Sequence, residues 1–257
     1  MEHQNQLDAS LRRLKLPGML FNLPMRIREA QEADLDYGEF LSLLVQDECC
    51  QRENNTLKTR LRDARFGQEN TFEGYDFKFN ENAIPAKLVR ELAACRFVDM
   101  KQNVVIAGPP GIGKTHIAKS VGHEACRRGN TVLFKKAASL LDELKSEKLM
   151  LKYTLFRKCM KTDLLIIDDF GFKKLDNEET ECLYRIVDER LGNRSIIVTS
   201  NRPPEDWLSI FPDPVVGGAM LDRLVSGSIK IIVNSKDGKS YRNEGIKMKG
   251  ESAEKTI

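Results

Sequence analysis

The chain has 257 residues, of which 41% are hydrophobic and 31% are charged, and its formal net charge is +3 at pH 7. This length and apolar content predict a packed core in one large domain, or in a modest domain with an appendage. No apolar run approaches the roughly 18 residues that span a bilayer, and the opening MEHQNQLDAS lacks the apolar core of a signal peptide. We therefore expect a cytoplasmic protein with no membrane partner. The six cysteines form no CxxC pair and the three histidines are not grouped with them, so metal-ligand spacing is absent.

The first part of the chain has helical periodicity. Leucines recur at helical spacing from Leu7 to Leu14, and a second pattern begins at Asp36, a candidate N-cap, and continues to about Arg65. The stretch FGQENT then breaks the pattern and is typical of a linker. We expect a separate N-terminal helical domain over residues 1–66.

Beyond the linker, strand and helix patterns alternate. The expected strands are 103–107, 131–135, 163–168, 195–199 and 228–233, and the expected helices are 114–128, a region within 137–160, 177–191 and a short one near 217–225. This alternation predicts an α/β fold over residues 67–233, with a parallel sheet covered by helices on both faces. The last stretch, 234–257, is polar and lysine-rich without apolar periodicity, so we expect a flexible tail.

A glycine-rich motif, GPPGIGKT at 108–115, follows the first of these strands and opens a helix. It fully matches the phosphate-loop pattern GxxxxGK followed by Ser or Thr, whose backbone N–H groups surround a phosphate chain at a helix N-terminus. Lys114 is expected to reach the β and γ phosphates of ATP, and the Thr115 hydroxyl to hold Mg²⁺. The expected nucleotide contacts are Gly108, Pro109, Pro110, Gly111, Ile112, Gly113, Lys114, Thr115 and His116. The alternative is a glycine-rich turn without a ligand.

Two acids end a later buried strand in the motif DLLIIDDFG. Because ligands bind at the carboxyl ends of parallel strands, we expect Asp168 to hold Mg²⁺ and Asp169 to orient or deprotonate the attacking water. Many ATPases of this type have Glu at the second position, so the shorter Asp169 bears on the efficiency of hydrolysis. The alternative is a capped strand end with solvated acids.

Two further residues follow in the order that such a site requires. Asn201 ends the strand in IIVTSNRPP and is expected to sense the γ phosphate if that strand lies centrally, although Asn is also an ordinary turn former. Arg223 lies on the short helix before the last strand. It is expected either to stabilise charge on a neighbouring subunit's nucleotide or to form a surface salt bridge with Asp222 or another nearby acid.

The ordered set GPPGIGKT, LLIIDDFG, TSN and LDRL resembles the IstB-like and DnaC-like clade of AAA+ ATPases, over roughly residues 5–235. Within that clade, three runs are most similar to the IstB family of bacterial insertion-sequence helper ATPases: LRRLKLPGMLFNL, RELAACRFVDMKQNVVIAGPPGIGKTHIA and FGFKKLDNEETECLYRIVDER. The resemblance implies an AAA+ P-loop NTPase core and a bacterial cytoplasmic location. Only 24 residues follow Val233, too few for the C-terminal helical lid of most AAA+ proteins, and this clade is similar in lacking it.

The family further implies ATP-dependent assembly on DNA, with ATP and Mg²⁺ bound between subunits of a homo-oligomer, and cooperation with the transposase of the same element. Two basic runs suit contacts to the backbone of duplex DNA with little sequence reading. The candidate DNA contacts are Lys58, Arg62 and Arg65 on one helical face, and Lys135 and Lys136 after a strand. The alternative for each run is a solvated helix face.

We therefore expect an ATP-dependent DNA-binding ATPase that assists a transposase. One alternative is a DnaC-like loader of the replicative helicase, with the same ATPase core and a different client for its N-terminal domain. Another is a DNA-binding scaffold in which bound ATP only stabilises the assembly, because Asp169 supports hydrolysis poorly.

Overall fold

The computed structural model describes residues 2–67 and 70–234, and the tail expected at 234–257 lies outside these ranges except for Asn234. The chain divides into two compact units, Met1–Thr59 and Arg60–Ile257. This division precedes the expected boundary at residue 66 by several residues. No helix in the described ranges combines the length and the apolarity that a membrane span requires.

The first unit is helical. Its elements are α1 (Glu2–Arg13), α2 (Pro17–Glu32) and α3 (Tyr37–Ala64), whose last residues belong to the second unit. The expected N-cap at Asp36 is confirmed, because the Glu39 backbone N–H donates to Asp36 Oδ1 at 2.8 Å and the Asp36 N–H donates to Glu39 Oε2 at 3.0 Å. This reciprocal capping box fixes the start of α3.

Helices α2 and α3 cross closely at Gly18. A Cβ on Gly18 would lie 2.7 Å from both the Asp47 carbonyl oxygen and the Glu48 Cα atom, so only glycine fits. The Glu48 carboxylate accepts hydrogen bonds from the Gly18 N–H at 2.7 Å and the Met19 N–H at 3.3 Å, which satisfies free donors at the start of α2. A small core of Leu11, Leu23 and Leu44 holds the three helices together.

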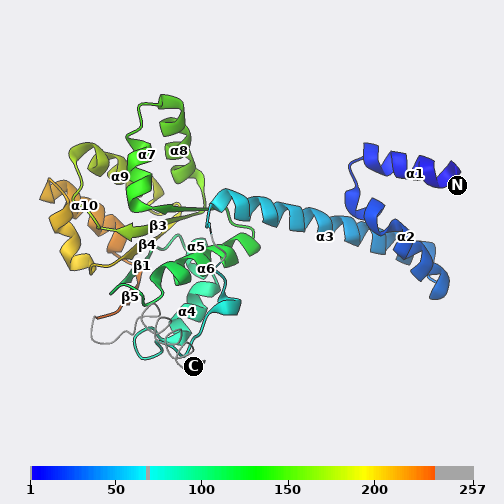
Figure 1. Ribbon diagram of the computed structural model, residues 1–257, viewed down its shortest axis with the longest axis horizontal. Helices are drawn as coiled ribbons and strands as arrows, with labels where there is room; N and C mark the ends of the chain where they lie inside the picture. Colours follow the sequence, from blue (N-terminus) through cyan, green and yellow to red (C-terminus); the bar gives the residue numbers. More distant parts are fainter. Residues whose placement is uncertain (1, 68–69, 235–257) are drawn as a thin grey trace, which may run out of the picture. The chain divides into compact units, whose positions relative to one another are not determined.

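The second unit alternates strands and helices (Figure 1). Its strands are β1 (Val104–Ala107), β2 (Val132–Lys136), β3 (Leu164–Phe170), β4 (Ser195–Ser200) and β5 (Ile229–Ile232). Its helices are η1 (Phe72–Gly74), α4 (Ala86–Ala93), α5 (Arg96–Asp99), α6 (Lys114–Arg127), α7 (Ala137–Leu144), α8 (Leu149–Lys161), α9 (Asn177–Arg190), η2 (Pro204–Ile210) and α10 (Pro214–Val225). Every expected strand is present within two residues of its expected ends. Helices α4, α5, η1 and η2 are additions that periodicity did not predict.

The five strands form one parallel sheet in the order β2-β3-β4-β1-β5. Alternate strand residues face opposite layers: Val105, Leu165 and Val198 join the core beneath α7 to α10, whereas Ile166 approaches α6 on the other face. Placing β4 between β1 and β3 brings the ends of these three strands together, as the expected role of Asn201 requires.

The chain around residue 66 packs on the P-loop helix α6. The Phe66 ring is buried and stacks on His123 with ring centroids 4.5 Å apart. A Cβ on Gly122 would lie 2.6 Å from Phe66 Cε1, so this helical glycine leaves the space that the ring occupies. The last turn of α3 and Phe66 are therefore part of the second unit, which explains why the division falls before the expected linker.

Candidate nucleotide-binding site

The phosphate loop joins β1 to α6 with a backbone that three glycines make possible. Gly108, Gly111 and Gly113 have φ values of 153°, 85° and 99°, in a region that side chains disfavour. At Gly108 a Cβ would also lie 2.8 Å from the Val233 carbonyl oxygen. The helix begins directly after the loop, at Lys114, so its free N–H groups and the positive end of its dipole face the loop.

The Lys114 ammonium lies inside this loop. It donates to the carbonyl oxygens of Gly108 at 2.8 Å and Pro109 at 2.9 Å, and to Asn201 Oδ1 at 2.7 Å. The contact to Asn201 joins the phosphate loop to the end of β4. The structure thus brings together two residues that sequence reasoning had connected only by motif order.

Asp168 is fully buried beside Thr115. Its Oδ1 atom accepts hydrogen bonds from the hydroxyls of Thr115 at 2.8 Å and Thr199 at 2.5 Å, whereas its Oδ2 atom is buried without a hydrogen-bond partner among the described residues. Burial raises the pKa of Asp168, although the two hydroxyls oppose that shift. A carboxylate with a free oxygen beside a threonine hydroxyl fits Mg²⁺, which prefers hard oxygen ligands.

Asp169 occupies a bulge in the sheet. Ile167 pairs with Val198 and Phe170 with Ser200, so β3 has one more residue than β4 at this point. Asp169 has a φ of 58°, and its N–H donates to the Thr199 hydroxyl at 3.0 Å. A bulge turns a side chain out of the regular alternation. Two consecutive acids can therefore face the same region, Asp168 toward Thr115 and Asp169 into the cavity.

These groups surround a cavity of about 640 Å³. Its lining residues are Gly74, Tyr75, Asp76, Pro110, Gly111, Gly113, Lys114, Thr115, His116, Asp169, Phe172 and Asn201. The cavity therefore contains most of the predicted nucleotide contacts. Of the others, Gly108 and Pro109 contribute carbonyl contacts to Lys114, and Ile112 is buried under the loop.

One wall of the cavity comes from a segment that sequence reasoning missed. His116 Nδ1 lies 3.2 Å from Asn70 Nδ2, and its Nε2 lies 3.2 Å from the Thr71 carbonyl oxygen. The Tyr75 and His116 ring centroids are 5.5 Å apart, and Tyr75 also makes an edge contact with Phe77. The aromatic spacing in TFEGYDFKF was the available signal. It has no helix or strand period, so it predicted neither an element nor a site.

The end of β4 is held by a buried polar network. The Ser200 hydroxyl donates to the Phe170 carbonyl at 2.7 Å, and the Trp207 indole N–H lies 3.2 Å from Ser200 Oγ and 3.0 Å from the Arg202 carbonyl. The Trp207 side chain is fully buried and meets the Phe170 ring edge-on. This network fixes the backbone on both sides of Asn201.

Arg223 does not line the cavity of its own chain. Its Nε donates to Asp188 Oδ1 at 2.9 Å, and its guanidinium lies 5.1 Å from the centre of the Tyr184 ring. Within its own chain Arg223 therefore forms a salt bridge, as one of the two expectations stated, and its partner is Asp188 and not Asp222.

The predicted DNA contacts differ in exposure. Lys58, Arg62 and Lys136 are exposed, and Arg65 is also exposed but lies past the end of α3 with a φ of 61°, so it does not continue the helical face. The predicted DNA contact of Lys135 does not fit the structure, because its side chain is buried and pairs with Glu143 on α7.

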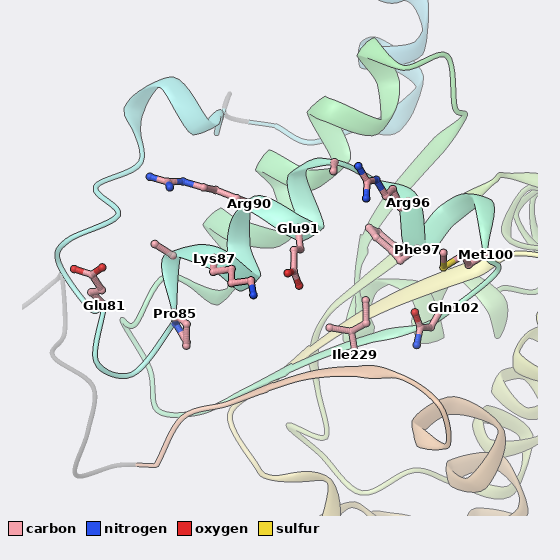
Figure 2. A pocket seen from close by; sticks show the side chains of 12 residues that line it. Glu81, Pro85, Lys87, Arg90, Glu91, Arg96, Phe97, Met100, Gln102 and Ile229 are labelled. Carbon is pink, nitrogen blue, oxygen red and sulfur yellow. The ribbon is translucent and has the colours of Figure 1, made fainter.

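A larger cavity, of about 790 Å³, lies between α4, α5 and the edge strand β5 (Figure 2). Glu91 and Ile229 point toward each other across it, and its rim carries both acids and bases. None of the predicted site residues lines it. The phosphate loop lines the smaller cavity and not this one, so the smaller cavity is the candidate nucleotide site.

Comparison with known proteins agrees with this geometry. A family model described as IstB-like ATP binding protein matches residues 9–249. An ATP-binding protein in an insertion sequence of Mycobacterium tuberculosis is 38% identical over 92% of this chain and 93% of its own length. The IS21 ATP-binding protein of Pseudomonas aeruginosa is 34% identical over 93% of this chain and 89% of its own length.

Solved structures share the fold of the second unit. The replication initiator DnaA bound to AMPPCP and single-stranded DNA matches with a TM-score of 0.55 and 22% identity, over 66% of this chain and 51% of that one. The DnaC helicase loader matches with a TM-score of 0.51 and 19% identity, over 68% of this chain and 98% of the loader chain. These likenesses show an AAA+ P-loop fold. With the sequence relatives, they establish that the chain belongs to the IstB-like ATP-binding proteins, an AAA+ family of insertion sequences.

Proposed function

We propose that the protein is a DNA-binding ATPase that assists the transposase of its own insertion sequence. The observation that carries the ATPase part is the convergence of Lys114, Thr115, Asp168, Asp169 and Asn201 around one cavity. These residues come from the start of α6 and from the ends of two strands, β3 and β4, and together they supply the groups that phosphoryl transfer to water requires.

Each group has a distinct task in the proposed reaction. The loop N–H groups and Lys114 bind the phosphate chain, and Thr115 and Asp168 hold Mg²⁺ through oxygen atoms. When bound, the ion neutralises charge that develops on the phosphate oxygens. Asp169, turned into the cavity by the bulge, orients the attacking water and accepts its proton. Asn201, whose amide already contacts Lys114, positions the γ-phosphate end.

The DNA and oligomer parts of the proposal rest on the family and on charge. Lys58, Arg62, Arg65 and Lys136 are exposed cations suited to phosphate contacts, and Lys135 is dropped from this set. Arg223 is proposed to act on the nucleotide of a neighbouring subunit, with assembly in the cytoplasm of a bacterium. Three relatives of 34% to 38% identity come from insertion sequences, which favours a transposition helper over a helicase loader.

Paired substitutions test the ATPase. Lys114→Ala should lower the affinity for a fluorescent ATP analogue by about 100-fold or more, because it removes the charge that faces the phosphates. Asp169→Asn should bind the analogue nearly as well as the parent but release phosphate about 10²-fold to 10³-fold more slowly, because it removes the base. Duplex binding should require ATP in the parent and be lost with Lys114→Ala.

Lys87→Ala is the matched control, because Lys87 is exposed on α4 outside the nucleotide cavity. Unchanged analogue binding by Lys114→Ala would refute the nucleotide site. Equal phosphate release by Asp169→Asn and the parent, with ATP-dependent duplex binding retained, would favour the scaffold alternative.

A further inference from the structure

Thr199 on β4 contacts both acids of the candidate nucleotide site. Its side chain is fully buried, and it lies opposite the point where β3 bulges. A bulge sets two residues of one strand opposite a single residue of its neighbour, and here the two are Asp168 and Asp169. One side chain is therefore in a position to serve two acids that have different tasks.

The hydrogen bonds of the Thr199 hydroxyl have a fixed direction. The Asp169 backbone N–H, at 3.0 Å, can only donate, so the hydroxyl oxygen accepts from it. The hydroxyl proton is then donated to Asp168 Oδ1, at 2.5 Å. Because a hydroxyl has one proton to donate and lone pairs to accept, Thr199 joins the two acids in a single chain of hydrogen bonds.

The bond to Asp168 determines which carboxylate oxygen remains available. Oδ1 accepts from the hydroxyls of Thr199 and Thr115, whereas Oδ2 has no hydrogen-bond partner among the described residues. A carboxyl group otherwise rotates over a broad range about its last bond, so the bonds to Oδ1 keep Oδ2 in one direction. Thr199 thereby helps to orient the oxygen that fits Mg²⁺.

The bond to the Asp169 N–H holds a backbone conformation that side chains disfavour. Asp169 has a φ of 58°, in the left-handed region, and such conformations persist where the surrounding structure fixes them. The bulge interrupts the regular strand pairing at Asp169, and the Thr199 hydroxyl supplies an acceptor for its N–H. This backbone sets the direction in which the Asp169 carboxylate enters the cavity.

Resting on the proposed ATPase function, we infer that Thr199 is a positioning residue that couples the two acids. Its hydroxyl orients Asp168 for the metal ion and Asp169 for the attacking water, so that both are aligned by one group. Thr199 does not itself line the cavity. Loss of the hydroxyl should therefore change the requirement for Mg²⁺ and the rate of hydrolysis, and leave binding of the phosphate chain intact.

Thr199→Val keeps the shape of the side chain and removes the hydroxyl. Without Mg²⁺, the full-length variant should bind a fluorescent ATP analogue within about twofold of the parent, since the loop N–H groups are unchanged. The Mg²⁺ concentration that gives half of the metal-dependent increase in analogue binding should rise about tenfold or more, and phosphate release at saturating Mg²⁺ should slow by up to about 100-fold. Thr199→Ser, which restores the hydroxyl, should stay within about threefold of the parent in both measurements.

A second comparison separates coupling from a general loss of stability. If Thr199 acts on water through Asp169, Thr199→Val should slow phosphate release by only about threefold or less once Asp169→Asn has removed the base. Thr180→Val is the matched control, because it removes another buried threonine hydroxyl, which donates to the Asp176 carbonyl oxygen at 2.7 Å outside the nucleotide cavity. It should lower the temperature of thermal unfolding and leave both nucleotide measurements at the parent values.

An unchanged Mg²⁺ requirement and an unchanged rate in Thr199→Val would overturn the inference. Equal losses in the serine and valine variants would overturn it too, because packing and not the hydroxyl would then be responsible, and so would fully additive effects of Thr199→Val and Asp169→Asn. If Thr199→Val does not fold, Thr199→Ala carries the same expectations. A parent that releases no phosphate would refute the proposed ATPase without any variant, while Mg²⁺-dependent analogue binding would still decide whether Thr199 orients Asp168.

Discussion

At the scale of single residues, Asp168 combines a functional position with an unfavourable environment. Its carboxylate is fully buried, one oxygen has no hydrogen-bond partner among the described residues, and burial raises its pKa. Such a group lowers the stability of the fold in the absence of its ligand. The same oxygen is available to bind the Mg²⁺ of the proposed reaction, because no hydrogen bond from the described residues occupies it.

Asp168→Asn should therefore raise the free energy of unfolding at neutral pH, by on the order of 1 kcal/mol. The direction of this change follows from proton linkage. Because the pKa of Asp168 is higher in the folded state, the unfolded state loses its proton first as the pH rises. The free energy of unfolding therefore falls between the unfolded-state pKa and the folded-state pKa. The gain from the substitution should accordingly grow over that interval and stay constant above it. Urea unfolding of the parent and of Asp168→Asn without nucleotide, at several pH values, measures this difference in the free energy of unfolding.

Asp163 is the matched control, because its pKa is shifted in the opposite direction to that of Asp168. Burial opposes ionisation there, but hydrogen bonds from the Thr131 N–H and hydroxyl lower the pKa of Asp163 overall. Asp163→Asn should therefore destabilise the protein at neutral pH, with the loss shrinking as pH falls. If both substitutions destabilised to the same extent, the carboxylate environment of Asp168 would not have the proposed effect.

At the scale of elements, the alternation of strands and helices was predictable because it follows from periodicity and from the phosphate-loop motif. The start of α3 was predictable too, since Asp36 and Glu39 form a local capping box. The pairing of Lys135 with Glu143 was not, because it joins a strand to the following helix and depends on their packing. Likewise, only the pairing of β3 with β4 reveals the bulge at Asp169.

The crossing of α2 and α3 gives a test at this scale. Gly18→Ala should destabilise the first unit by about 1–3 kcal/mol, because the added methyl meets backbone atoms that cannot move aside. Gly218→Ala on α10 is the control, since its added Cβ meets no atom within 4 Å other than the backbone of its own helix, and alanine favours a helix by up to about 1 kcal/mol. Thermal unfolding of both variants measures the difference, and equal stability would argue against a tight crossing.

At the scale of the whole molecule, the ATPase proposal requires more than one chain. Arg223 is outside the cavity of its own chain and is held by Asp188. Arg223→Ala should bind ATP nearly as well as the parent but hydrolyse it about 10³-fold more slowly, if this arginine acts on a neighbour. Phosphate release and analogue binding, measured on the same preparation, separate the two effects.

Mixing variants decides whether the arginine acts in trans. Arg223→Ala combined with Lys114→Ala should recover part of the activity, because an intact lysine site then meets an intact arginine on the next subunit. Asp188→Asn is the control, since it removes the carboxylate that pairs with Arg223 within the chain and should retain hydrolysis. Absence of recovery in mixtures that still assemble on DNA would exclude a shared site.

The buried network at the end of β4 has a practical consequence for all of these measurements. Trp207 is the single tryptophan of the chain, and its indole lies beside Ser200 and the Arg202 carbonyl, next to Asn201. Its fluorescence spectrum therefore reports from one known place, without any label. A shift of its emission on mixing with ATP would let stopped-flow optics follow events at the γ-phosphate end in real time, separately from the release of products.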